Sequence, residues 1–375
     1  MNDPRINKLA KLLVNYSTNV EAKNLVAITA LTPAEPLVQE LFRETLRCGA
    51  YPYFLNRGYP PVIQGLENLG EIYIKTANDD QLKHVDIFYK KVVEEFDVLI
   101  SILSQSNTQS EANVDPSRIS LRRRAHSDLI NTYFKRTASG ELRRVLTLFP
   151  TLGYAQDAEM SLEEFEEYVF STTYCDVDDP VAEWRRINIA QEKLVNWLAG
   201  KKRLEIKGPN VDLIMSIEDR TFVSCAGKEN IPDGEIYSGP VEESVNGWIR
   251  FTYPDYGTGR EINGIELEFK DGKVVQSSAT KNEESLREML DTDPGARYVG
   301  ELGIGTNERV NKYIKNMLFD EKIGGTIHLA LGHGYPETGS KNESAIHWDM
   351  LCDMKEGGQI FVDDELFYES GEFKI

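Results

Sequence analysis

Histidine is scarce in this chain, yet three of its five histidines fall within residues 327–350, IHLALGHGYPETGSKNESAIHWDM. Inside this segment, SAIHWDML shows the period-two alternation of a strand. On a strand, His347 and Asp349 point to one face because successive side chains alternate. On a helix the same side chains would lie about 200° apart. The spacing therefore predicts a strand that presents a histidine and a carboxylate together, with an apolar opposite face made of Ile346, Trp348 and Met350.

A second strand pattern, TIHLALG at residues 326–332, repeats this arrangement. His328 would stand on one face, and the opposite face would carry Ile327, Leu329 and Leu331. Neutral imidazole and carboxylate oxygen are ligands that zinc, cobalt and manganese accept. A single histidine on a strand is more often a hydrogen-bonded core or surface residue. Two such histidines together with Asp349 favour a metal site.

Two divalent ions would need several carboxylates to offset their charge, so acidic residues beside turns are further candidates. Glu235 in NIPDGEIYSGP follows a Pro-Asp-Gly turn at a predicted strand start. Glu301 in YVGELGIGTN is flanked by Gly300 and Gly303, which would let the backbone approach a ligand. The adjacent acids in VEESVNG, Glu242 and Glu243, would supply at most one ligand, since neighbouring side chains point to opposite faces of a strand.

The elements that position these residues follow from the wider pattern. In the first half, LVAITA, YPYFLN, FDVLISIL and RRVLTLFPT are strand-like runs separated by helical segments, which predicts an open α/β sheet. No GxGxxG follows the first strand, so a nucleotide is not the expected ligand. A helix is expected from Val181 to about Ala199.

The character of the sequence changes at Gly200. Short alternating strand patterns follow it, and Asp271-Gly272 between two of them is a hairpin signal. NEESLREMLD interrupts the strands as a helix. We therefore predict an α/β N-terminal domain with an open sheet over residues 1–200, and a β-rich α+β C-terminal metal-binding domain over residues 201–375.

Composition limits the class of partner. The formal net charge of −19 argues against a nucleic-acid partner, because such binding needs a basic face. The one basic run, Arg122 to Arg124, is expected to be a solvated helix face. No apolar run approaches a membrane span, and the N-terminus lacks the pattern of a signal peptide. Four cysteines without a CxxC pair suit a reducing compartment, so a cytoplasmic protein is expected.

Several ordered motifs between about Leu204 and Met350 resemble a known family. They are NIPDGEIYSGPVEESVNGWIRF, GIELEFKDGKVV, LDTDPGARYVGELGIGTN, HLALGHGYP and AIHWDM. Together they closely resemble the thermophilic-type metallo-aminopeptidases, typified by aminopeptidase T and aminopeptidase S. The resemblance implies two divalent metal ions, commonly zinc, cobalt or magnesium, a peptide substrate that loses its N-terminal residue, and a homodimer.

The resemblance also implies roles for individual residues. The implied metal ligands are Glu235, Glu301, His328, His347 and Asp349, and Tyr335 in GYP matches the catalytic tyrosine. Glu321 in FDEKIGGTIH resembles a further carboxylate ligand, but it stands farther from His328 than the family pattern implies. His333 occupies a place where the family has a small residue, and the segment between His328 and His347 is shorter, which bears on substrate specificity.

A mechanism follows from this ligand set. Two metals about 3.5–4 Å apart would activate a water toward the scissile carbonyl. Glu301 would bridge the metals or accept the proton from that water, and Tyr335 would donate to the developing oxyanion. Two alternatives remain open. One is a metal-dependent hydrolase of a small-molecule amide on the same scaffold, and the other is a non-catalytic binding protein with a structural metal site.

Overall fold

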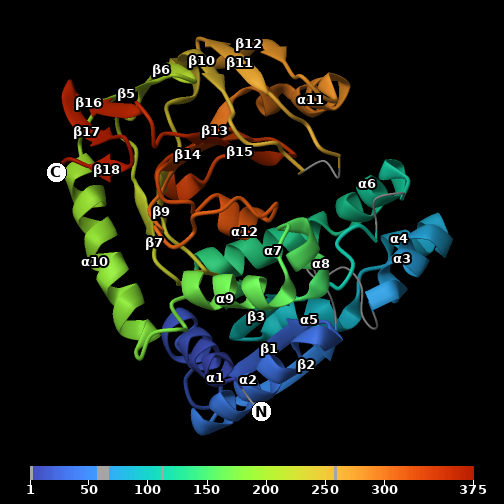
Figure 1. The fold of residues 1–375 in the computed structure, drawn as a ribbon. Coiled ribbons are helices and arrows are strands. Elements are labelled where there is room, and N and C mark those ends of the chain that lie inside the picture. Colours follow the sequence, from blue (N-terminus) through green and yellow to red (C-terminus); the bar gives the residue numbers. More distant parts are fainter. Residues whose placement is uncertain (1–2, 57–66, 111–113, 257–259) are drawn as a thin grey trace. The chain divides into compact units, whose positions relative to one another are not determined.

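The computed structural model describes residues 3–56, 67–110, 114–256 and 260–375 (Figure 1). The chain forms two compact units. The first comprises Met1–Trp184 and Gly227–Pro232, and the second comprises Arg185–Ala226 and Asp233–Ile375. The first division falls inside helix α10 (Pro180–Leu198), which matches the helix predicted from Val181. None of the described helices is both long enough and apolar enough to span a membrane.

The first unit is built on a five-stranded parallel sheet in the order β2-β1-β3-β4-β8. Its strands are β1 (Leu25–Ala30), β2 (Tyr51–Asn56), β3 (Val98–Leu103), β4 (Arg143–Leu148) and β8 (Asn230–Ile231). β1 and β3 are almost wholly buried, as expected of central strands covered on both faces. The open α/β sheet predicted for the first half is confirmed.

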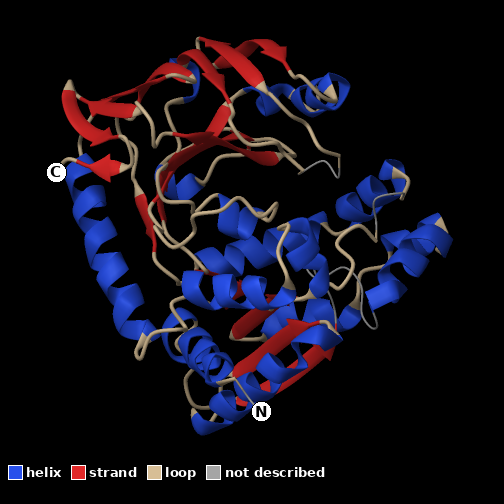
Figure 2. Ribbon diagram, viewed as in Figure 1, coloured by secondary structure: helices blue, strands red, loops and turns tan. Residues whose placement is uncertain are grey.

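Helices account for most of the rest of this unit (Figure 2). They are α1 (Pro4–Lys11), η1 (Leu12–Ser17), η2 (Thr32–Ala34), α2 (Glu35–Arg47), α3 (Glu67–Thr76), α4 (Asp79–Lys83), α5 (Ile87–Glu95), α6 (Pro116–Ala125), α7 (Ser127–Ala138), α8 (Leu152–Asp157) and α9 (Leu162–Thr172). The expectation of a solvated arginine run on α6 is wrong for Arg122. Its side chain is buried with the guanidinium 4.7 Å from the ring centre of Tyr73, whereas Arg123 and Arg124 are exposed.

The second unit contains two sheets. The larger has eight strands in the order β12-β11-β10-β6-β5-β16-β17-β18. These strands are β5 (Arg203–Gly208), β6 (Val211–Ser216), β10 (Asn246–Arg250), β11 (Glu266–Lys270), β12 (Lys273–Ser278), β16 (Gln359–Val362), β17 (Glu365–Glu369) and β18 (Glu372–Phe373). The predicted hairpin joins β11 to β12, with positive φ at Asp271 (49°) and Gly272 (80°).

The smaller sheet of the second unit carries the residues singled out for chemistry. Its order is β15-β14-β13-β9-β7, with antiparallel neighbours throughout. The strands are β7 (Val223–Cys225), β9 (Glu235–Ser238), β13 (Val299–Gly305), β14 (Thr326–Gly332) and β15 (His347–Asp353). Short helices complete the unit: η3 (Glu242–Ser244), α11 (Glu283–Leu290), η4 (Pro294–Arg297), α12 (Met317–Asp320) and η5 (Pro336–Thr338).

One apolar core serves both sheets of the second unit. The smaller sheet contributes alternate residues, including Ile236, Leu302, Ile304, Ile327, Leu329, Leu331, Trp348 and Met350. The larger sheet contributes residues such as Leu204, Ile206, Leu213 and Leu267 to the same cluster. The period-two alternation predicted for the two histidine strands is therefore confirmed, and it commits the other face of the smaller sheet to polar side chains.

Candidate metal centre

Four neighbouring strands bring the predicted ligands to one face of the smaller sheet. Glu235 opens β9, Glu301 lies in β13, His328 in β14, and His347 and Asp349 in β15. The register aligns His328 with the Gly303 position of β13, and Asp349 with the Ala330 position of β14. Residues two apart along each strand share a face, so these five side chains stand opposite the apolar core.

The first group of side chains comprises Glu235, Glu301 and His328, all buried. Nε2 of His328 lies 3.3 Å from Oε2 of Glu235 and 3.4 Å from Oε1 of Glu301. One imidazole nitrogen thus faces two carboxylates from the strand beside it and the strand beyond.

The second group comprises Glu301, His347 and Asp349. Nε2 of His347 lies 3.2 Å from Oε2 of Glu301 and 3.5 Å from Oδ2 of Asp349. Glu301 therefore belongs to both groups, with Oε1 directed to one histidine and Oε2 to the other. The side chain of His347 is 25% exposed, against 1% for His328, so the second group is the one reached from solvent.

The electrostatics of the protein without metal reflect this crowding. Burial by itself would raise the pKa of Glu301, but hydrogen bonds and charges from His328 and His347 lower it to about 2. Burial by itself would lower the pKa of the two histidines, but the carboxylates raise it to about 9 for His328 and about 10 for His347. Cationic imidazoles thus balance the carboxylates when no metal is bound.

The donor set fits a divalent cation. Imidazole nitrogen and carboxylate oxygen are ligands of zinc, cobalt and manganese. Oε2 of Glu235 is buried and, within the described part of the chain, accepts no hydrogen bond, although it lies 3.3 Å from Nε2 of His328. In the metal-free protein the cationic His328 offsets the charge of this oxygen without bonding to it, and a metal ion would give the oxygen a direct partner.

The orientation of His347 is fixed from behind. Its Nδ1 lies 2.8 Å from the carbonyl oxygen of His333 and must donate to it, so Nε2 is the nitrogen directed at Glu301 and Asp349. In the metal-free protein Nε2 carries a proton, and once that proton is lost Nε2 has the lone pair that a metal would take. The side chain of His333 is itself exposed. The backbone of His333 therefore contacts the site, whereas its exposed imidazole is a member of neither group.

Tyr335 lies beside the second group. Its ring centre is 5.0 Å from that of His347 and 5.2 Å from that of Tyr237, which packs edge-on against it. The hydroxyl of Tyr237 donates to Oε1 of Glu337 at 3.2 Å. Burial and the surrounding carboxylates raise the pKa of Tyr335 well above its ordinary value, so its phenol keeps its proton.

Glu321 lies close by but belongs to neither group. It follows α12, and its Oε1 pairs with Nζ of Lys322 at 2.6 Å. No sequence motif pointed to Lys322, which is completely buried and also lies 2.5 Å from Oε1 of Glu235. Burial by itself would lower the pKa of Lys322, but the surrounding carboxylates raise it well above its ordinary value. A lysine directly after an acidic residue in FDEKIGG was the only signal of this contact.

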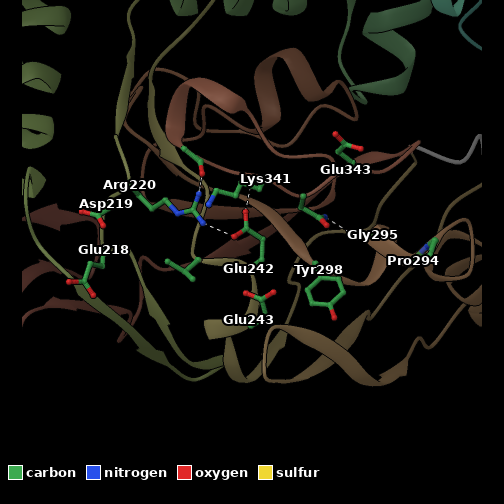
Figure 3. Close-up of a pocket in the computed structure, with 13 residues that line it drawn as sticks. Glu218, Asp219, Arg220, Glu242, Glu243, Pro294, Gly295, Tyr298, Lys341 and Glu343 are labelled. Atoms are coloured by element: carbon green, nitrogen blue, oxygen red, sulfur yellow. Dashed lines mark hydrogen bonds and ion pairs between the residues drawn. The ribbon is translucent and has the colours of Figure 1, made fainter.

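Glu242 and Glu243 lie elsewhere. The expectation that they alternate on a strand is wrong, because they form the short helix η3 and line a pocket of about 720 Å³ (Figure 3). Glu242 accepts from the Arg220 guanidinium at 2.6 Å and from the backbone amide of Lys341 at 2.6 Å. Arg220 also donates to the carbonyl of Gly339. None of the five predicted ligands lines this pocket. The contacts of Glu242 and Arg220 instead tie η3 to the loop that follows Tyr335.

The two glycines that flank Glu301 leave space for neighbouring protein groups close to the β13 backbone. A Cβ at Gly303 would lie 2.0 Å from Nε2 of His328, and one at Gly300 would lie 2.4 Å from the carbonyl oxygen of Gly332. The backbone at these two positions therefore comes close to protein groups, namely the imidazole of His328 and the carbonyl at the start of the Tyr335 loop.

Comparisons with known proteins agree with this architecture. A family model described as thermophilic metalloprotease (M29) matches residues 2–373. The chain is 27% identical to aminopeptidase 2 of Geobacillus stearothermophilus, over 93% of this chain and 92% of the relative. It is 25% identical to aminopeptidase T of Thermus thermophilus, over 98% and 95%. The solved structure of wild-type AmpT from Thermus thermophilus superposes with a TM-score of 0.85 over 99% of each chain, at 23% identity, and so shares the fold.

Proposed function

The chain belongs to the thermophilic metalloproteases (M29), and on this premise we propose that it is an aminopeptidase that removes N-terminal residues from peptides with two divalent metal ions. The family resemblance of the sequence motifs is confirmed by this match. The relatives named above are aminopeptidases, which supports the same activity here. The count of metals, their identity and the role of each residue are our proposals.

The sharing of Glu301 carries the proposal of a metal pair. A single ion would need only one group of ligands, whereas here two groups of three share one carboxylate. Each oxygen of Glu301 faces a different histidine, at 3.4 and 3.2 Å, which is the arrangement of a carboxylate that bridges two cations. Glu235 and His328 would complete one site, and His347 and Asp349 the other.

Zinc, cobalt, manganese or magnesium would suit these ligands to different degrees, with imidazole favouring the first three. When bound, a metal pair would supply the Lewis acidity that activates water at neutral pH and a position for the free α-amine of the substrate. The 25% exposure of the His347 side chain supports a position for this chemistry that a substrate can reach.

The remaining steps belong to the side chains. Glu301 holds the two sites together or accepts the proton of the attacking water. Tyr335, with its phenol protonated beside His347, donates a hydrogen bond to the oxyanion that develops on the scissile carbonyl. We propose a weaker role for Glu321, whose carboxylate is engaged by Lys322.

The decisive experiment compares aminoacyl anilides that have a free amine with their N-acetylated counterparts, in the presence of added zinc, cobalt or manganese. We expect release from the free-amine set alone, with loss of activity on chelation and in His347→Ala. Cleavage of the acetylated set would instead favour a hydrolase of small-molecule amides, and cleavage of neither set would favour a binding protein with a structural metal.

We also propose a cytoplasmic homodimer, on the strength of the family resemblance and of the cysteine pattern. Light scattering coupled to size exclusion would give the mass in solution directly. A mass near the 42.5 kDa of one chain would contradict the dimer.

A further inference from the structure

A third group of potential ligands lies next to the proposed metal pair. Cys225 on β7 is the direct cross-strand partner of Glu235 on β9, so their side chains share a face. Asp233 precedes Glu235 by two residues, and ligand atoms of all three lie within 4.8 Å of one another. A thiol with two carboxylates is a donor set that zinc or cadmium would accept.

This third group already contains a cation. The ammonium of Lys322 lies 2.5 Å from Oε1 of Glu235, 2.6 Å from Oε1 of Glu321 and 3.6 Å from Oδ1 of Asp233. The lysine is completely buried, so its charge is compensated by these carboxylates rather than by bulk solvent. A metal ion in the same space would face a fixed positive charge at contact distance.

Because Lys322 contacts only one of them, the two carboxylate oxygens of Glu235 have different partners. Oε1 is engaged by Lys322 at 2.5 Å, whereas Oε2 lies 3.3 Å from Nε2 of His328 and accepts no hydrogen bond within the described residues. Glu235 can therefore offer one oxygen, and only one, to the group that contains Glu301 and His328.

We propose that Lys322 is a positioning residue that acts as the resident cation of the Cys225–Asp233–Glu235 group, excluding a third metal from it and directing one oxygen of Glu235 to the metal pair. The claim that Lys322 directs one oxygen of Glu235 rests on the proposed metal pair. The claim that Lys322 excludes a metal from the group containing Cys225 rests only on the contacts of Lys322.

Cadmium tests this inference, because a cadmium–thiolate bond adds ultraviolet absorption that carboxylate and imidazole ligands do not. In the wild type we expect no absorption that depends on Cys225, and Cys225→Ser should bind the same number of cadmium ions. In Lys322→Met, which keeps an unbranched side chain without the charge, we expect one additional equivalent together with new thiolate absorption. Both should disappear in Lys322→Met/Cys225→Ser.

Lys341→Met is the matched control. It removes the same charge from an exposed lysine of the same unit, and it should add no equivalent. Cys225-dependent absorption in the wild type, or a folded Lys322→Met that gains no Cys225-dependent equivalent, would overturn the inference. If Lys322→Met fails to fold, the wild type and Cys225→Ser are compared alone. Cadmium-induced absorption that is lost in Cys225→Ser overturns the inference, and equal absorption in the two proteins supports it. The total count in the wild type separately tests the metal pair.

Discussion

Gly303 on β13 lies directly across from His328 on β14, and the missing side chain of the glycine is the space that the imidazole occupies. A Cβ at this position would stand 2.0 Å from Nε2, the atom proposed to bind metal. We predict that Gly303→Ala displaces His328 and weakens metal binding by about 10–100-fold, as loss of ligand orientation commonly does. Metal titration by calorimetry measures this change. Gly208→Ala is the control, because its Cβ would meet its nearest neighbour at an ordinary 3.4 Å.

Removal of the shared carboxylate should differ from removal of an unshared one. We predict that Glu301→Gln loses both metal equivalents after dialysis, because its oxygens face both histidines. Asp349→Asn should lose one equivalent, because Asp349 belongs to one group only. Elemental analysis of the dialysed proteins measures both counts. Equal losses in the two variants would contradict the assignment of Glu301 as the bridge.

Tyr335 should contribute to the rate rather than to metal binding. We predict that Tyr335→Phe lowers kcat by about 10²–10³-fold, the usual cost of one lost oxyanion donor, with little change in KM or metal content. Steady-state kinetics on a free-amine anilide measures the effect. Tyr237→Phe is the control, because it keeps the ring that packs on Tyr335 and removes only the hydroxyl bonded to Glu337. A comparable loss in both variants would argue for a packing role.

The metal-free protein should lose stability as the pH rises. The folded pKa values of His328 and His347, about 9 and about 10, lie above their ordinary 6.5. Their charged forms therefore stabilise the folded state fully below about pH 6.5, and this contribution disappears as the pH rises through 9 and 10. Thermal melts of chelated protein from pH 6 to 10 should show a falling Tm, flatter in His347→Gln.

The same linkage has the opposite sign at Glu301. Its folded pKa of about 2 lies below the ordinary 4.5, so its contribution to stability is present above pH 4.5 and is lost as the pH falls toward 2.

Metal binding at pH 7 should release protons from His328 and His347, since neutral imidazole is the form that binds metal. Calorimetry in buffers of different ionisation enthalpy counts these protons, and a count of zero would contradict the raised histidine pKa values.

His333 should affect substrate choice without affecting metal content. Its carbonyl orients His347, and this contact survives any change of side chain. Its imidazole is exposed on the loop that leads to Tyr335. We therefore predict that His333→Ala keeps both metals and changes kcat/KM unevenly across a panel of aminoacyl anilides. The same fold-change in kcat/KM for every substrate in the panel would show that His333 does not determine specificity.

Much of the site was predictable because strand periodicity is a local property. Residues two apart on a strand share a face, so the sequence alone predicted that His347 and Asp349 lie side by side. It also predicted that His328 lies on the face opposite an apolar stripe. The turn before Glu235 and the glycines around Glu301 marked two further strands. The order of strands and helices likewise determined the α/β character of the first half and the β-rich character of the second.

Other features depend on contacts between segments far apart in the chain. The two-sided position of Glu301 follows from the register of β13 against β14 and of β14 against β15. Glu242 leaves the site because Arg220 and the Lys341 amide hold it elsewhere. Lys322 joins Glu235 across a separation of 87 residues. Alternation along a strand decides which face of the sheet a side chain takes. Which side chains meet on that face depends on the register and packing of strands that lie far apart in the sequence, and only the tertiary structure sets these.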